Sequence, residues 1–124
     1  MKEVFLVFAG GGLGSLLRYQ LGRFINQTYL SAFPTATLMV NIVACFLLGL
    51  IMGYLSHPEH QNQAAKLLLA VGFCGGFSTF STFSYETLLL IRQGQTTLAL
   101  GNIFLSIILC LIATFTGVIL VKPT

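Results

Sequence analysis

One stretch of this chain, from Gly72 to Glu86, limits what it can fold into more than any other. It reads GFCGGFSTFSTFSYE and combines a glycine cluster, a ladder of hydroxyl side chains and regularly spaced phenylalanines. It lies inside an apolar run from Leu67 to Ile91 that is long enough to cross a bilayer. In hydrocarbon, freed backbone groups and rows of hydroxyls are costly unless protein or water satisfies them. Such a span predicts an ion or substrate site and not a simple anchor.

Composition places the whole chain in a membrane. Of its 124 residues, 56% are hydrophobic and 7% are charged, more apolar surface than a soluble domain of this size can bury. The net charge of +3 is scattered and contains no basic run, so nucleic acid is not an expected partner. No base, nucleophile and orienting group converge in the sequence, so we do not expect an enzyme.

A membrane span needs roughly 20 mostly apolar residues, and four such spans can be placed. We therefore expect an all-α integral membrane protein, with a single four-helix domain over residues 1–124 and the third helix broken in mid-membrane. The spans are approximately 4–24, 34–55, 67–91 and 98–121. Small residues recur at a spacing of four, which predicts close helix packing. These pairs are Gly10/Gly14, Gly11/Ser15, Gly49/Gly53 and Gly72/Gly76.

The basic residues are balanced across the predicted membrane. Four spans place Lys2, Lys66 and Lys122 on one side. Arg18, Arg23 and Arg92 then lie on the other side. Lys and Arg in short loops set membrane orientation, and three against three gives no preferred direction. Insertion in both orientations, and hence an antiparallel homodimer, becomes possible.

Phe77, Phe80 and Phe83 are spaced by three, so on a helix they approximately share one face. Hydroxyl residues fill the positions between them, which a helix made only for lipid would not need. Ring edges carry partial positive charge, and beside hydroxyl donors they could solvate a small anion without trapping it. Ordinary packing aromatics are the alternative interpretation.

Two other spans carry polar side chains at a spacing of four. Asn102, Ser106, Cys110 and Thr114 form a stripe on the fourth span, and Thr37, Asn41 and Cys45 form one on the second. Each hydroxyl could instead bond back to the carbonyl four residues earlier. The Asn41 amide needs partners, either an ion or a neighbouring helix.

Two charged residues lie near the ends of spans. Arg18 could form an electropositive vestibule that concentrates anions, or its side chain could simply reach the interface. Glu86 could pair with an arginine or cap polar backbone. Cys45, Cys74 and Cys110 all lie in apolar stretches. Their odd number, and the lack of a partner at metal-ligand spacing, predict plain small-residue packing.

Three segments carry a family resemblance: GGLGSLLRY from Gly11 to Tyr19, Asn41, and GGFSTFSTFS from Gly75 to Ser84. On these residues the chain resembles the Fluc/CrcB family of bacterial fluoride channels over essentially its full length. The resemblance implies an antiparallel, dual-topology homodimer in the bacterial inner membrane, with two pores for passive export of fluoride and hence resistance to fluoride toxicity. The partners implied are fluoride, a second copy of the chain and the lipid bilayer.

The resemblance also implies roles for individual residues. Phenylalanine ring edges and Ser, Thr and Asn donors would contact fluoride, Arg18 would line the vestibule, and a structural sodium ion would lie at the dimer centre on the backbone carbonyls of Gly75 and Ser78. The implied pore residues are Asn41, Phe80, Phe83, Ser81, Thr82, Ser84, Ser106, Cys110 and Thr114.

Two other functions fit the sequence less well. A small dual-topology, proton-coupled exporter needs a carboxylate near the centre of a span, whereas Glu3 is terminal and Glu86 is off-centre. A non-transporting assembly subunit would explain the glycines but would leave the hydroxyl ladder without a use.

Overall fold

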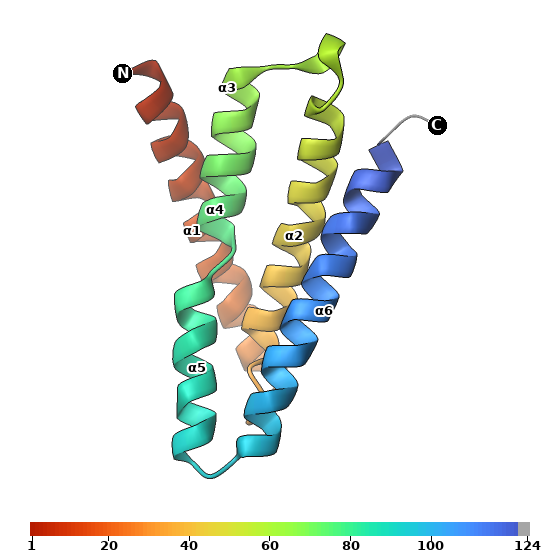
Figure 1. The fold of residues 1–124 in the computed structure, drawn as a ribbon. Coiled ribbons are helices and arrows are strands. Elements are labelled where there is room, and N and C mark those ends of the chain that lie inside the picture. Colours follow the sequence, from red (N-terminus) through yellow and green to blue (C-terminus); the bar gives the residue numbers. More distant parts are fainter. Residues whose placement is uncertain (122–124) are drawn as a thin grey trace.

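The computed structural model describes residues 1–121, and every regular element in that range is helical. Four helical segments are long and apolar enough to cross a membrane, which confirms that part of the predicted fold. Figure 1 shows them as a bundle of long helices. They are α1 (Lys2–Thr28), α2 (Thr35–Leu55), the composite third segment (Gln63–Arg92) and α6 (Thr96–Val121). The chain is a multi-pass membrane protein.

The third segment is divided into several pieces. It begins with a short α-helical turn, α3 (Gln63–Ala65), continues as a π-helix, η2 (Lys66–Cys74), and returns to α-helix in α4 (Gly75–Phe77). At Ser78 and Thr79 the backbone becomes extended, with ψ of 158° and 115°, before α5 (Phe80–Arg92) begins. The predicted interruption of the third helix therefore falls at these two residues.

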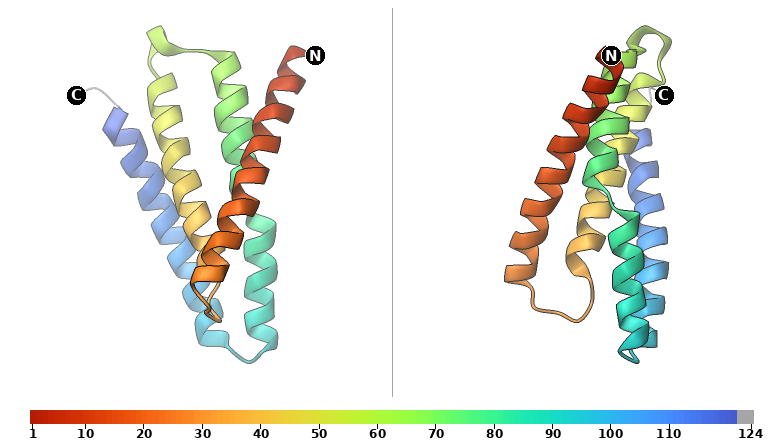
Figure 2. Two further views of the ribbon diagram at one scale, coloured as in Figure 1. Left: turned by 180° about the vertical axis from the view of Figure 1, so that it is seen from behind. Right: turned by 90° about the vertical axis from the view of Figure 1, so that its left-hand side faces the viewer.

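The connectors alternate between the two ends of the bundle, as Figures 1 and 2 show. The N-terminus and the connector that contains the 3-10 helix η1 (Pro58–His60) lie at one end, with Lys2 and Lys66. The α1–α2 and α5–α6 connectors lie at the other end. The latter turns at Gly94, whose φ of +75° favours glycine. Lys122, the third lysine of the charge argument, lies outside the described residues.

Glycines form two seams where helix backbones touch. Gly10 and Gly14 of α1 lie against the backbone of η2 and α4, and Gly76 lies against Gly11 of α1. Gly49 of α2 lies against the carbonyl of Thr114 on α6. Added methyl groups at these glycines would overlap neighbouring backbone atoms. Close approach is how membrane helices associate when lipid is as apolar as their side chains, so the small-residue spacings act in packing.

We expect Gly14→Ala to lower the free energy of unfolding by about 1–3 kcal/mol, because its methyl group would overlap the Phe73 carbonyl. Denaturant titration of the purified protein in detergent measures this. Gly12→Ala on the same helix is the matched control, since nothing lies within 4 Å of its added methyl group. Equal stability of both variants would show that the seam does not hold α1 in place.

Candidate functional site

The break in the third segment is held in place by a side chain of α2. Thr79 donates its backbone N–H to Oδ1 of Asn41 at 2.8 Å, and its carbonyl accepts from Nδ2 of Asn41 at 3.1 Å. An asparagine amide has one acceptor and two donors, so it can replace both backbone partners that Thr79 lost by leaving the helix. Asn41 therefore bonds to a neighbouring helix segment, one of the two roles that its position allowed.

Helix α1 supports the same break from another side. The carbonyl of Gly76 accepts hydrogen bonds from Nε of Arg18 at 3.1 Å and from Oγ of Ser15 at 3.4 Å. The last carbonyls of a helix have no intrahelical donor, and a cation there is favoured by the helix dipole. Half-buried Arg18 thus has a hydrogen-bond partner within the bundle, and its side chain does not simply extend to the membrane–water interface.

Several carbonyls at the break are left without their helical donors, among them those of Gly75 and Ser78. The amide of Thr79, four residues after Gly75, donates to Asn41 instead. The amide of Thr82, four residues after Ser78, donates to Oγ1 of Thr79 at 3.2 Å, an N-cap of α5. No residue within 1–121 donates to either carbonyl oxygen. Free carbonyl oxygens suit a hard cation, so Gly75 and Ser78, predicted as sodium ligands, fit that role chemically.

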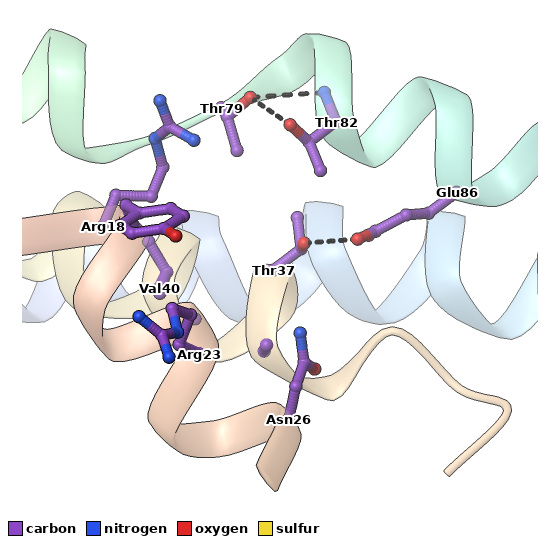
Figure 3. Close-up of a pocket in the computed structure, with 11 residues that line it drawn as sticks. Arg18, Arg23, Asn26, Thr37, Val40, Thr79, Thr82 and Glu86 are labelled. Carbon is purple, nitrogen blue, oxygen red and sulfur yellow. Dashed lines mark hydrogen bonds between the residues drawn. The ribbon is translucent and has the colours of Figure 1, made fainter. Parts of the chain in front are cut away.

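A first cavity of about 240 Å³, here called the arginine pocket, lies between α1, α2 and α5. Figure 3 shows Arg18 and Arg23 on one side of it, with Thr82 and Glu86 across from them. Oε1 of Glu86 accepts a hydrogen bond from Thr37 at 2.8 Å. The residues that line this pocket are Arg18, Tyr19, Gly22, Arg23, Asn26, Ala36, Thr37, Val40, Thr79, Thr82 and Glu86.

A second cavity of about 240 Å³, here called the phenylalanine pocket, lies between α2, α5 and α6. The rings of Phe80 and Phe83 meet there at a tilt of 42°, with centroids 5.6 Å apart. Thr79 lines both pockets. The residues that line the phenylalanine pocket are Asn41, Cys45, Ser78, Thr79, Phe80, Phe83, Ser106, Ile107 and Cys110. None of these described residues carries a charge.

A hydrogen-bonded chain ties the phenylalanine pocket to the packing of α5 against α6. Oγ of Ser106 donates to Oδ1 of Asn102 at 3.4 Å, and Nδ2 of Asn102 donates to Oγ1 of Thr87 at 2.9 Å. Thr87 in turn donates to the carbonyl of Phe83 at 2.7 Å. Asn102 is 1% exposed, so an unsatisfied amide there would be costly. This chain fixes the backbone of Phe83 relative to α6.

The residues predicted for the pore are divided between the two pockets, and some line neither. Asn41, Phe80, Phe83, Ser106 and Cys110 come together in the phenylalanine pocket, whereas Thr82 lines the arginine pocket beside Arg18. Three predicted residues line neither cavity: Ser81 and Ser84 are exposed, and Thr114 bonds back to the carbonyl of Cys110 at 3.0 Å.

One expectation about the phenylalanine stripe is wrong. Phe77 does not share a face with Phe80 and Phe83, because the helix breaks between them. Phe77 is 1% exposed and packs with Val40 and Ala44, whereas Phe80 is 79% exposed in the single chain. Because of the interruption, the Phe77 ring lies in the core, whereas the rings of Phe80 and Phe83 lie at the pocket.

Sequence reasoning missed several residues of the site. Thr79 received no special role, although it caps α5 and lines both pockets. Thr87 escaped notice because a threonine in an apolar helix is usually bonded to its own helix, as this one also is. The pairing of Thr37 with Glu86 depends on the packing of α2 against α5, which no local pattern predicts.

The helices and pockets define a class: a multi-pass membrane protein whose interrupted third span presents amide and hydroxyl groups beside phenylalanine rings. Such a set of groups can replace the water around a small anion. The family model described as "CrcB-like protein, Camphor Resistance (CrcB)" matches residues 5–118. The chain belongs to this family, which confirms the resemblance stated from its motifs.

Similar proteins carry a common name. Proteins named "Fluoride-specific ion channel FluC" from Flavobacterium psychrophilum and Pyrococcus furiosus are 43% and 44% identical to this chain over 122 residues, 98% of both chains in each case. The protein of that name from Gloeothece citriformis is 41% identical over the same share of both chains. The name is that of a channel and not of an enzyme, in agreement with the absence of catalytic groups expected from the sequence.

Proposed function

We propose that this chain forms a fluoride-selective channel that lets fluoride leave the cytoplasm passively. The observation that carries the proposal is the phenylalanine pocket, in which two tilted rings lie beside the Asn41 and Ser106 side chains without a charged neighbour among the described residues. The names of the similar proteins support the same substrate. Export in this way would protect a cell from fluoride.

The chemistry of the pocket suits fluoride because this ion is small and strongly hydrated. A pore must replace its water with close donors, and hydroxyl and amide groups provide them at short distances. Ring edges add weak positive charge without the deep binding that a cation would cause. A narrow path with such donors would exclude chloride by size. The arginine pocket, with Arg18 and Arg23, would raise the local concentration of anions at its mouth.

We propose further that two chains pair in opposite orientations, giving two pores. The segment at the break carries exposed Ser81 and Ser84, exposed Phe80, and the carbonyls of Gly75 and Ser78, which have no donor within residues 1–121. Lipid cannot satisfy these hydroxyls and carbonyls, so a second copy is the covering that fits them. The even distribution of basic residues between the two ends favours an antiparallel arrangement.

A sodium ion at the centre of this dimer would take the carbonyl oxygens of Gly75 and Ser78 from each chain. Its role would be structural, because it would neutralise the partial negative charge of carbonyl oxygens that accept no hydrogen bond from an amide. The hydrogen bonds of Asn41 and Thr79 support this proposal, because they draw away the amides that would otherwise occupy these oxygens. We place the dimer in the cell membrane, the inner membrane where a bacterium has two.

Fluoride efflux from liposomes that contain the purified protein tests the function directly. We expect a fluoride electrode to record rapid efflux, and we expect a chloride gradient of the same size to remain. In a planar bilayer the current should reverse at the fluoride Nernst potential whatever the pH gradient, because no proton is coupled. A reversal potential that follows pH would instead support a proton-coupled exporter, and equal passage of chloride would contradict the selectivity.

A further inference from the structure

We propose that Cys45 and Cys110 form a two-coordinate site for a thiophilic metal ion on the wall of the phenylalanine pocket. The site itself is a property of α2 and α6, whereas its effect on transport rests on the proposed channel function. Both thiols are free and half-buried, they line the same cavity, and the register of α2 against α6 places them opposite one another.

The packing of α2 against α6 explains why these thiols meet. The two helices run side by side in the same direction (Figures 1 and 2) and are in extensive contact. Gly49 lies against Thr114, and one turn later Gly53 lies against Val118, an offset of 65 residues in both cases. One turn before Gly49, the same offset pairs Cys45 with Cys110.

The register also explains why the pair faces the pocket. A further turn back along both helices, the offset of 65 residues pairs Asn41 with Ser106, and both of these line the phenylalanine pocket. The thiols thus occupy the position between the glycine seam, where the backbones touch, and the polar wall of the cavity. An ion that enters the pocket can reach both sulfur atoms.

The ligand set selects a particular class of metal. Sulfur ligands favour soft ions, and zinc would require about four ligands. Within residues 1–121 no group of three or more His, Cys, Asp or Glu side chains could hold a metal. A pair of thiols therefore suits d¹⁰ ions that accept two ligands in a line, such as Cu(I), Ag(I) and Hg(II).

Mercuric chloride is the probe of choice because HgCl₂ is uncharged and can enter an apolar cavity. Each thiol loses its proton on binding, since the thiolate is the ligand. One HgCl₂ and two thiols then give one bis-thiolate mercury complex, two protons and two chloride ions. No atom changes oxidation state. The bound metal would lie in the cavity that Asn41 and the phenylalanine rings also line, and would occupy part of the space proposed for fluoride.

The test uses Cys74→Ala as its background, because Cys74 is a third thiol, buried on η2, that does not line the pocket. Mercury per chain is counted by mass spectrometry after gel filtration, with an excess of a small monothiol as competitor. We expect one mercury ion per chain in this background. With Cys45→Ser or Cys110→Ser added, release should need at least about tenfold less competitor, because a second fixed thiol acts at an effective concentration of the order of millimolar.

Equal retention by the paired and single-thiol proteins would overturn the site. Cys45→Ala and Cys110→Ala are second variants to use if a serine in the packed seam prevents folding. The measurement of bound mercury per chain needs no fluoride, so it can be interpreted even if the proposed channel function proves wrong. In the Cys74→Ala protein, HgCl₂ should also stop fluoride efflux, with recovery on adding dithiothreitol. Retained mercury with undiminished efflux would overturn the placement of the site on the fluoride path.

Discussion

Fluoride efflux should fall to the level of protein-free liposomes when Phe80 or Phe83 is replaced by isoleucine. Isoleucine keeps an apolar side chain in the phenylalanine pocket but removes the positive ring edge that would face the ion. Fluoride that has lost part of its water would then lack a partner. A loss of about 2.7 kcal/mol in its stabilisation slows passage about 100-fold. A fluoride electrode in the efflux assay measures the effect.

Phe5→Ile is the matched control, since Phe5 is also exposed but lies near the start of α1 and lines neither pocket. We expect it to conduct as the unaltered protein does. Gel filtration should give all three variants the elution volume of the unaltered protein, so that a loss of transport is not a loss of assembly. Efflux at the unaltered rate in Phe80→Ile and Phe83→Ile would remove the rings from the mechanism.

Asn41→Leu should both destabilise the protein and stop transport. The variant leaves the N–H and the carbonyl of Thr79 without their partners, and each buried unsatisfied group costs about 1–3 kcal/mol. The break would lose the contact that holds it to α2, and the phenylalanine pocket would lose its amide. Denaturant titration in detergent and liposome efflux measure the two effects.

The comparison of Asn41→Asp with Asn41→Leu separates holding the break from contacting the ion. An aspartate keeps an acceptor for the Thr79 N–H, so we expect it to restore part of the stability that leucine loses. Its negative charge would repel an anion, so efflux should remain low. Gln27→Leu, which removes an exposed amide from α1, should change neither property. Normal efflux in Asn41→Asp would show that the fluoride path avoids this side chain.

Much of the fold can be predicted from local patterns in the sequence. Long apolar runs predict the four helices, because hydropathy acts within a few residues. The spacing of small residues similarly predicts where helices approach, as Gly49 and Gly14 illustrate.

The features that were missed depend on contacts between helices. Phe77 could not be separated from Phe80 and Phe83 without knowing that the extended backbone lies at Ser78 and Thr79. The meeting of Cys45 with Cys110 depends on a register across 65 residues, which no spacing within one helix reveals. Plain packing of separate cysteines was therefore the natural expectation, and the structure brings two of the three together.

The carbonyls of Gly75 and Ser78 also have a consequence for how the channel would be made. If two chains pair as proposed, a newly inserted chain would carry the oxygens of Gly75 and Ser78 unsatisfied in the bilayer until it meets a second copy. Such a lone subunit would be a short-lived species, open to quality-control proteases. The number of assembled channels would then rise more steeply than the rate of chain synthesis, because at low synthesis rates most chains would be degraded before they could pair.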